Sequence, residues 1–121
     1  MRMLLVDDDS RLRQVLKRLL NSQHHAIREA ADGEEALGLL REEPADLIFT
    51  DWQMPRMDGL AMTRALRGAG NRTPIIMFSG HGDPHTIVTA IQAGVNNYIP
   101  KPINAEVLFE KIQQTMGSLA A

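Results

Sequence analysis

The stretch that decides the fold is LIFTDWQMPRMDG, residues 47–59. It begins with a short, mostly apolar run bounded by turn-forming residues, which is typical of a strand buried on both faces. The run stops at a single carboxylate, Asp51, and a turn-rich segment follows. A carboxylate at the C-terminal end of such a strand lies at the edge of the sheet where open α/β folds bind ligands. We therefore expect Asp51 to be the chemical centre of the protein.

The composition limits the classes of protein to which the chain can belong. It has 121 residues, which suits one domain, and 44% of them are hydrophobic, enough for a substantial core. The formal net charge of −2 argues against binding to nucleic acid or to a membrane. Cysteine is absent, which excludes disulfides and thiolate ligands. Because the N-terminus does not resemble a signal peptide and no apolar run reaches transmembrane length, we expect a cytoplasmic location.

Strand-like and helix-like patterns alternate five times along the chain. The runs that predict strands are 3–6, 24–30, 46–50, 74–78 and 97–99, each followed by a helical pattern. The predicted helix caps are Asp9 or Ser10, Asp58, Asp83 and Asn104. Residues 116–121 are expected to fray. This order predicts a parallel sheet with helices on both faces, so every strand delivers its C-terminal end to the same edge.

Apolar residues recur at helical spacing in the predicted helices. The face expected to pack in the first helix is Leu12, Val15, Leu16, Leu19 and Leu20. The apolar residues that carry the fourth helix to Gly94 are Ile87, Val88, Ala90 and Ile91. The basic residues of the first helix, Arg11, Arg13, Lys17 and Arg18, are expected to form a solvated face.

The predicted strand ends bring a distinct set of polar side chains to one edge. In addition to Asp51, they are Asp7, Asp8 and Asp9 after the first strand, Ser79 after the fourth and Lys101 after the fifth. If the first and third strands are neighbours, two carboxylates about 4 Å apart repel each other by roughly 4 kcal/mol. Either one carboxylate stays protonated or a cation lies between them. Oxygen ligands favour Mg²⁺, with Mn²⁺ or Ca²⁺ as alternatives. Asp9 is expected to cap the helix rather than to bind the cation.

Phosphoryl transfer to Asp51 is the chemistry that suits this set. A carboxylate can act as a nucleophile and form an aspartyl-phosphate. A metal offsets the charge on the phosphoryl oxygens, while Lys101 and Ser79 can contact them. The sequence contains no P-loop, no nucleophile elbow, no zinc-protease motif and no dinucleotide-binding glycine motif.

Taken in order, these residues resemble the receiver domain of two-component response regulators, close to the chemotaxis-type single-domain form. The matching motifs are Val6-Asp7-Asp8, residues 51–59, Ser79-Gly80 and residues 98–102. The resemblance covers nearly the whole chain and implies that residues 1–121 form one receiver domain. It implies a flavodoxin-like, doubly wound (βα)5 three-layer sandwich whose five parallel strands have the order 2-1-3-4-5. We expect a complete single-domain regulator that is a monomer or a weak dimer, with a receiver cut from a longer protein as the alternative.

The resemblance also implies how the site works. Asp51 accepts a phosphoryl group from a sensor histidine kinase or a histidine phosphotransfer protein. The protein is then a switch rather than an enzyme, and catalyses only its own phosphotransfer and autodephosphorylation. Mg²⁺, for which Mn²⁺ can substitute, is held by Asp7, Asp8, Asp51 and the backbone carbonyl of Gln53. Gln53 and His81 lie where the family tunes access of the hydrolytic water.

Further implied roles concern the response to phosphorylation. Ser79 and Lys101 bind the phosphoryl oxygens, and Ser79 and Tyr98 form the switch, with the Tyr98 ring turning inward. The fourth helix, fifth strand and fifth helix form the output surface for an unknown downstream protein. The contacts expected on that surface are Ile87, Tyr98 and Lys111. The peptide bond between Lys101 and Pro102 is expected to be cis.

Two other functions stay open from the residues alone. The run from Asp7 to Ser10 has a faint likeness to the opening motif of aspartate-dependent phosphatases of the haloacid dehalogenase type. Asp7 would then be the nucleophile, but the chain is short for that class. The second alternative is an interaction module that keeps the fold without phosphorylation, and the intact acids, hydroxyl and lysine argue against it.

Overall fold

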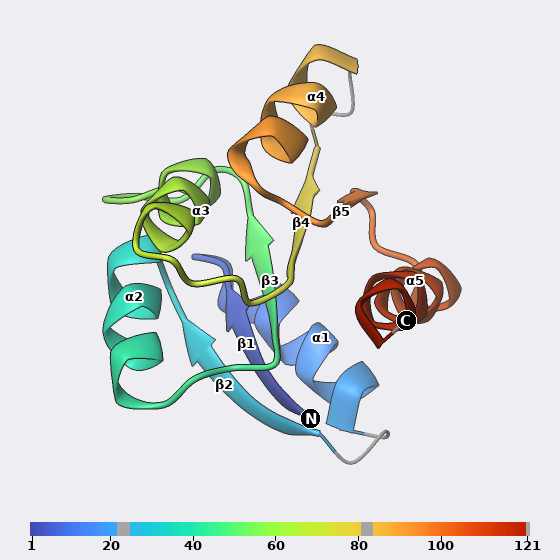
Figure 1. Cartoon of the computed structure of the whole chain (residues 1–121). Coiled ribbons are helices and arrows are strands. Elements are labelled where there is room, and N and C mark those ends of the chain that lie inside the picture. The colour runs from blue at the N-terminus through green and yellow to red at the C-terminus, as the bar shows by residue number, and fades with distance from the viewer. Residues whose placement is uncertain (22–24, 81–83, 121) are drawn as a thin grey trace.

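Five parallel strands alternate with five helices in the computed structural model, which describes residues 1–21, 25–80 and 84–120 (Figure 1). The strands are β1 (Arg2–Val6), β2 (Ala26–Ala30), β3 (Leu47–Asp51), β4 (Ile75–Ser79) and β5 (Asn97–Pro100). The helices are α1 (Ser10–Asn21), α2 (Gly33–Glu42), α3 (Gly59–Gly68), α4 (Pro84–Ala93) and α5 (Ala105–Ala120). The predicted alternation of strands and helices is therefore confirmed.

The sheet has the order β2-β1-β3-β4-β5, and all of its neighbouring strands are parallel. This order confirms the flavodoxin-like, doubly wound fold. The register brings the C-terminal ends of the strands together: Val6 pairs with Thr50, Asp51 with Phe78, and Ser79 with Pro100. The residues that follow β1, β3, β4 and β5 consequently meet at the C-terminal edge of the sheet.

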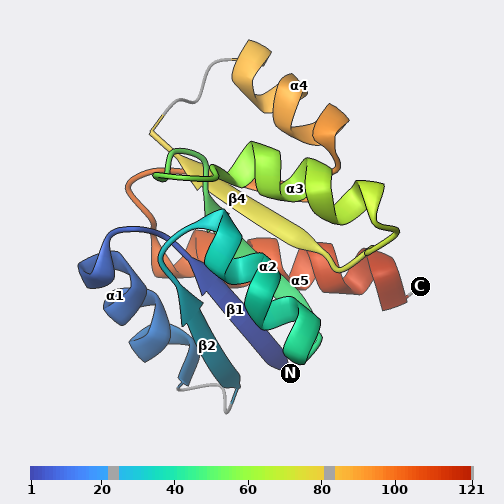
Figure 2. The ribbon, with the colours of Figure 1, turned by 90° about the vertical axis from the view of Figure 1, so that its left-hand side faces the viewer.

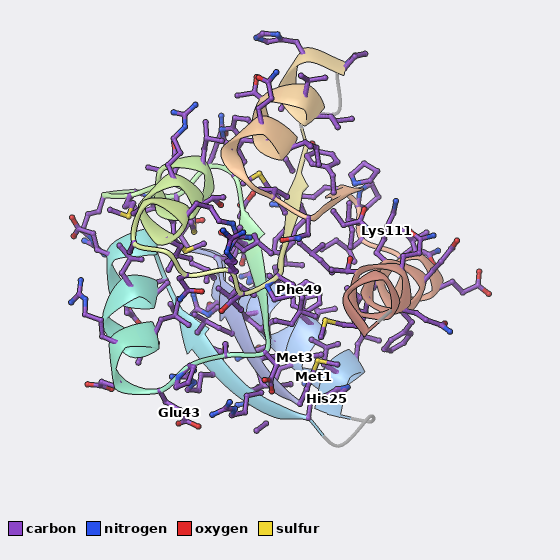
Figure 3. All side chains as sticks on the ribbon, viewed as in Figure 1. Met1, Met3, His25, Glu43, Phe49 and Lys111 are labelled. Carbon is purple, nitrogen blue, oxygen red and sulfur yellow. The ribbon has the colours of Figure 1, made fainter. Side chains whose placement is uncertain are left out.

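Helices cover both faces of the sheet, because alternate strand residues point to opposite sides. On one face, residues such as Ile48 and Met77 pack with α2, α3 and α4 (Figure 2). On the other face, Met3 and Phe49 pack with α1 and α5 (Figure 3). Every residue of β3 and β4 is buried, as the continuous apolar runs predicted.

Three apolar side chains of the helical patterns are exposed, and of these Val15 belongs to the face that was expected to pack. Val15 is 51% exposed, Val88 50% and Ile91 47%. Val15 lies about 100° around α1 from the buried Leu16, at the margin of the apolar stripe. On α4, the buried residue is Ala90, so the helix contacts the core through a narrow face. Val88 and Ile91 lie outside this face and are exposed to solvent.

The observed ends of the helices agree with most of the caps predicted from the sequence. Asp9 Oδ1 accepts from Arg11 N at 2.9 Å, and Asp58 Oδ1 accepts from Ala61 N at 2.8 Å, so both act as caps. Asn104 Oδ1 accepts from Glu106 N at 2.8 Å. The fraying expected from residue 116 is wrong, because α5 continues to Ala120 and Met116 packs on the core. His24, His81 and Asp83 lie outside the described residues.

None of the helices in the described ranges is both long enough and apolar enough to cross a membrane.

The junction of β3 and α3 is packed against backbone. Gly59, the first residue of α3, donates from its N–H to Trp52 O at 2.9 Å. A Cβ added at this position would lie 2.2 Å from Asp51 O. Thr50 Oγ1 also donates to Asp51 O at 2.9 Å. Only glycine therefore lets α3 begin this close to the end of β3, which fixes the backbone of Asp51.

Substituting Gly59 and Gly38, which both lie in helices, distinguishes the effect of close packing at Gly59 from the general effect of glycine on helix stability. Gly59→Ala should lower the free energy of unfolding by about 1–3 kcal/mol, because the new methyl group collides with backbone. Gly38→Ala should raise it by roughly 0.5–1 kcal/mol, since a Cβ there meets nothing within 4 Å. Urea unfolding followed by Trp52 fluorescence measures both. Equal effects of the two substitutions would contradict the packing argument.

Candidate functional site

Three carboxylates converge at the C-terminal edge of the sheet. Asp7 and Asp8 follow β1, and Asp51 is the last residue of the neighbouring β3. Each offers one oxygen, and these oxygens all lie within 4.8 Å of one another. Asp7 and Asp51 are buried, whereas Asp8 is exposed. The structure thus brings together the acids that the sequence predicted to meet.

The cluster is electrostatically unfavourable without a counter-ion. Two unit charges 4.8 Å apart repel by roughly 3–4 kcal/mol at the effective dielectric of a protein surface. Burial raises the pKa of Asp7 from 3.8 to about 6 against the opposing hydrogen bond from Asp9 N–H, and the charge of Asp51 adds to the rise. Asp7 Oδ2 is also buried and has no hydrogen-bond partner among the described residues. Asp7 therefore carries an unsatisfied buried acceptor and belongs to a group of like charges.

Asp51 is the member of the cluster that has a cationic partner. Lys101 Nζ lies 3.1 Å from Asp51 Oδ2, and Trp52 N–H donates to Asp51 Oδ1 at 2.7 Å. Lys101 Nζ also lies 5.6 Å from the centroid of the Phe78 ring, within the range of a cation–π contact. Both oxygens of Asp51 are thus oriented by donors, which fixes the carboxylate at the end of β3.

The fourth and fifth strands supply the remaining side chains. Ser79 ends β4 and is 2% exposed, and its carbonyl accepts from Lys101 N at 2.9 Å. Because Asp51 pairs with Phe78, Ser79 lies one residue further along the strand beside Asp51. The peptide bond between Lys101 and Pro102 is cis, as the resemblance implied. Ser79 and Lys101 therefore both lie at the edge that holds the carboxylates.

The other predicted residues lie in different surroundings. Gln53 is exposed in the turn after β3, and the role of its carbonyl stays a prediction. Tyr98 is only 7% exposed and belongs to the core cluster on the side of α2, α3 and α4, so this conformation offers little of it to a partner. Ile87 packs partly against the same cluster, and Lys111 lies on α5 (Figure 3).

Arg13 supports the acidic edge in a way that the sequence did not predict. Its guanidinium donates to the carbonyl of Asp7, and its Nε lies 3.2 Å from Glu29 Oε1 on β2. Lys17 Nζ lies 3.6 Å from the other oxygen of Glu29. The expectation of a solvated basic face is therefore wrong for Arg13, whose side chain is 18% exposed, whereas that of Lys17 is 45% exposed. The sequence signal that could have predicted this contact is Glu29, an acid within the predicted second strand. The contact forms because β2 lies beside β1.

The donor set fits a hard divalent cation. Three carboxylates within 4.8 Å, one of them with an unpartnered buried oxygen, match the oxygen-only coordination that Mg²⁺ prefers. Asp7, Asp8 and Asp51 are the residues that could hold it. Such an ion would remove the repulsion within the cluster and give Asp7 Oδ2 the partner it lacks.

The fold and this acidic edge define a class of protein, and comparison of sequences identifies it. The model of the response regulator receiver domain family matches residues 3–113. The chain therefore belongs to the response regulator receiver domains. It acts in two-component phosphorelay signalling as a signalling switch rather than as a classical enzyme. This assignment disfavours the haloacid dehalogenase alternative.

Individual relatives are similar over nearly their whole lengths. A chemotaxis protein CheY homologue of Campylobacter jejuni is 39% identical, over 98% of this chain and 94% of the relative. The chemotaxis protein CheY1 of Helicobacter pylori is 40% identical over 98% of both chains. The crystal structure of a two-component response regulator from Clostridium difficile superposes with a TM-score of 0.93, at 26% identity, over 100% of this chain and 99% of that one. The chain is thus similar to CheY-like single-domain receivers.

The coarse requirements of the family follow from this membership. Receiver domains generally depend on Mg²⁺, and the cluster of Asp7, Asp8 and Asp51 is present here. Receiver domains also interact with histidine kinases or phosphotransfer proteins and with downstream targets.

Replacing Asp7 should stabilise the metal-free protein in a pH-dependent way. The raised pKa means that the folded state keeps a proton which the unfolded chain releases between pH 3.8 and about 6. The contribution of Asp7 to stability is therefore complete below pH 3.8 and is lost as the pH rises through about 6. At about pH 7, Asp7→Asn should raise the free energy of unfolding by about 1–3 kcal/mol.

Urea unfolding in the presence of a chelator, repeated from acidic to neutral pH, measures the increase in the free energy of unfolding caused by Asp7→Asn. It should shrink as the pH falls toward 3.8. Asp9→Asn is the matched control, because Asp9 is exposed and its cap is retained. A gain that does not change with pH would show that burial of the Asp7 charge is not its cause.

Proposed function

We propose that Asp51 accepts a phosphoryl group from a phosphorylated histidine of a sensor histidine kinase or a histidine phosphotransfer protein. A carboxylate oxygen of Asp51 forms a bond to phosphorus while the bond between phosphorus and the imidazole nitrogen breaks. The electron pair of that bond returns to the imidazole, which takes up a proton. The observation that carries the proposal is the ion pair between Lys101 Nζ and Asp51 Oδ2 within a cluster of three carboxylates.

Each neighbouring residue has a part that its position supports. Lys101 and the Ser79 hydroxyl bind phosphoryl oxygens, because both lie at the strand ends beside Asp51. Asp7, Asp8 and the carbonyl of Gln53 complete the ligands of Mg²⁺, for which Mn²⁺ can substitute. When bound, the ion neutralises charge on the carboxylates and on the phosphoryl oxygens.

The same site releases the phosphoryl group and ends the signal. In autodephosphorylation, a water oxygen forms a bond to phosphorus as the bond to the Asp51 oxygen breaks. Inorganic phosphate leaves and the carboxylate is regenerated.

Phosphorylation switches the surface formed by α4, β5 and α5. The phosphoryl group draws the Ser79 hydroxyl toward it and changes the position favoured by the Tyr98 ring. Tyr98 lies on β5 in register with Met77, two residues before Ser79 on β4, which supports a link between them. Ile87 and Lys111 are contacts for the downstream protein. Residues 1–121 then act as one receiver domain, as a monomer or a weak dimer.

Labelling with a small phosphoryl donor tests the acceptor. In the presence of Mg²⁺ and acetyl phosphate, the intact mass of the wild-type chain should increase by one phosphoryl group. Asp51→Asn should show no adduct, because it lacks the nucleophilic oxygen. Asp9→Asn, which keeps the helix cap, should be labelled like the wild type. An adduct that persists in Asp51→Asn would overturn the assignment of the acceptor.

Lys101→Ala should separate metal binding from switching. Its affinity for Mg²⁺, followed by Trp52 fluorescence, should equal or exceed that of the wild type, because the carboxylate ligands are unchanged and a competing positive charge beside Asp51 is removed. Addition of beryllofluoride should alter hydrogen exchange in α4 of the wild type but not of the variant, because Lys101 no longer binds the phosphoryl mimic. The same change of exchange in both proteins would show that Lys101 does not couple the site to α4.

A further inference from the structure

The loop that leaves Asp51 contains a strained turn. Arg56 has a φ of 63°, in the left-handed region that a side chain with a Cβ rarely adopts. Met57 N–H donates to Pro55 O at 2.7 Å and closes a three-residue turn around Arg56. A γ-turn whose central residue has a positive φ is rare and strained. Glycine or asparagine suits such a position better, so the presence of arginine calls for an explanation.

An ion pair accounts for the arginine. Arg56 Nε lies 2.7 Å from Asp32 Oδ2, although the two residues are 24 positions apart. The side chain of Asp32 is only 3% exposed, and its Oδ1 accepts from Glu35 N at 2.9 Å to cap α2. These hydrogen bonds lower the pKa of Asp32, the one from Glu35 N–H contributing most. The guanidinium is therefore bound to a buried, fixed carboxylate.

A second contact joins the same two segments. Gly33 N donates to Met57 O at 2.9 Å, directly beside the ion pair. A Cβ at Gly33 would lie 2.8 Å from Met57 O, so the segments approach as closely as glycine permits. Two consecutive residues of the loop are consequently attached to the start of α2.

The other end of this loop reaches the site itself. Trp52 N–H donates to Asp51 Oδ1 at 2.7 Å, and Trp52 O accepts from Gly59 N at 2.9 Å. The segment between Trp52 and Gly59 is thus a closed loop whose first residue orients the carboxylate of Asp51. Trp52 N–H also lies 3.2 Å from Phe78 O on β4, and the far side of the loop is held by Arg56. Release of the turn would therefore disturb the loop that directly follows Asp51.

We propose that Arg56 is a positioning residue, whose ion pair with Asp32 holds the strained loop after Asp51 in the conformation that lets the carboxylate of Asp51 bind a divalent cation. The inference rests on the proposed Mg²⁺ site of Asp7, Asp8 and Asp51. Arg56 acts through the loop and does not itself touch the ion.

The sign of the effect separates positioning from charge. Removal of a positive charge from the domain would by itself tighten the binding of a cation, because it lowers the repulsion that the cation meets. Loss of a positioning contact weakens binding, as when the partners that orient metal ligands are removed. A role confined to stability would leave the affinity of the folded protein unchanged.

Titration with MgCl₂ at constant ionic strength, followed by Trp52 fluorescence below the melting range, tests the proposal. Arg56→Ala should bind Mg²⁺ about tenfold more weakly than the wild type. Arg56→Gly should show the same loss, although glycine adopts a positive φ without strain and so keeps the fold stable. Arg64→Ala is the matched control, since Arg64 is exposed on α3 and has no ion pair within the described part of the chain. Its affinity should equal or slightly exceed that of the wild type.

A double-mutant cycle and hydrogen exchange add independent readouts. Arg56→Ala in an Asp32→Asn background should cause little further loss of affinity, because the partner is already gone. The amides of Trp52 and Gly59 should exchange faster in metal-free Arg56→Ala than in the metal-free wild type. Wild-type protein that does not respond to Mg²⁺ would overturn the metal site and this inference together. Wild-type binding that Arg56→Ala matches or exceeds would overturn the positioning role alone and leave the proposed function standing.

Discussion

Repulsion among the carboxylates of Asp7, Asp8 and Asp51 is the interaction on which the rest of the structure depends. A parallel sheet places the ends of β1 and β3 side by side, and the register leaves no freedom to separate their acids. The chain reduces the cost with one ammonium group, Lys101, and with a proton that the buried Asp7 retains more readily than usual. Without a bound ion, the negative charge at this edge is only partly compensated. The edge is therefore suited to bind a cation, and in the proposed function a phosphoryl group as well.

A site of this kind needs a stiff support, and the core supplies it. β3 and β4 are buried along their whole length, and α3 begins against the backbone of Asp51 because Gly59 has no side chain. Arg13 holds the carbonyl of Asp7 while Glu29 on β2 holds Arg13. The stability of the buried sheet thus offsets the repulsion among the carboxylates at its edge. Such a local cost is common at functional sites.

The loop after Asp51 and the strand that carries Tyr98 are held in different ways. The loop is strained at Arg56 and attached to α2, whereas Tyr98 lies buried beside β4. In the proposed function, phosphorylation of Asp51 shifts packing on α4 and β5, and the burial of Tyr98 beside β4 supports that link.

The sequence by itself determined the alternation of strands and helices, the caps at Asp9, Asp58 and Asn104, and the set of acids, hydroxyl and lysine at the strand ends. These features depend on local periodicity, on short polar side chains near their own backbone, and on motifs in a fixed order. The tertiary structure alone decided that Val15, Val88 and Ile91 face outward, that Arg13 reaches Glu29, and that Arg56 pairs with Asp32. It also decided that Tyr98 is buried. Each of these depends on which distant segments pack together, because the energy of such contacts comes from neighbours that are far apart in the chain.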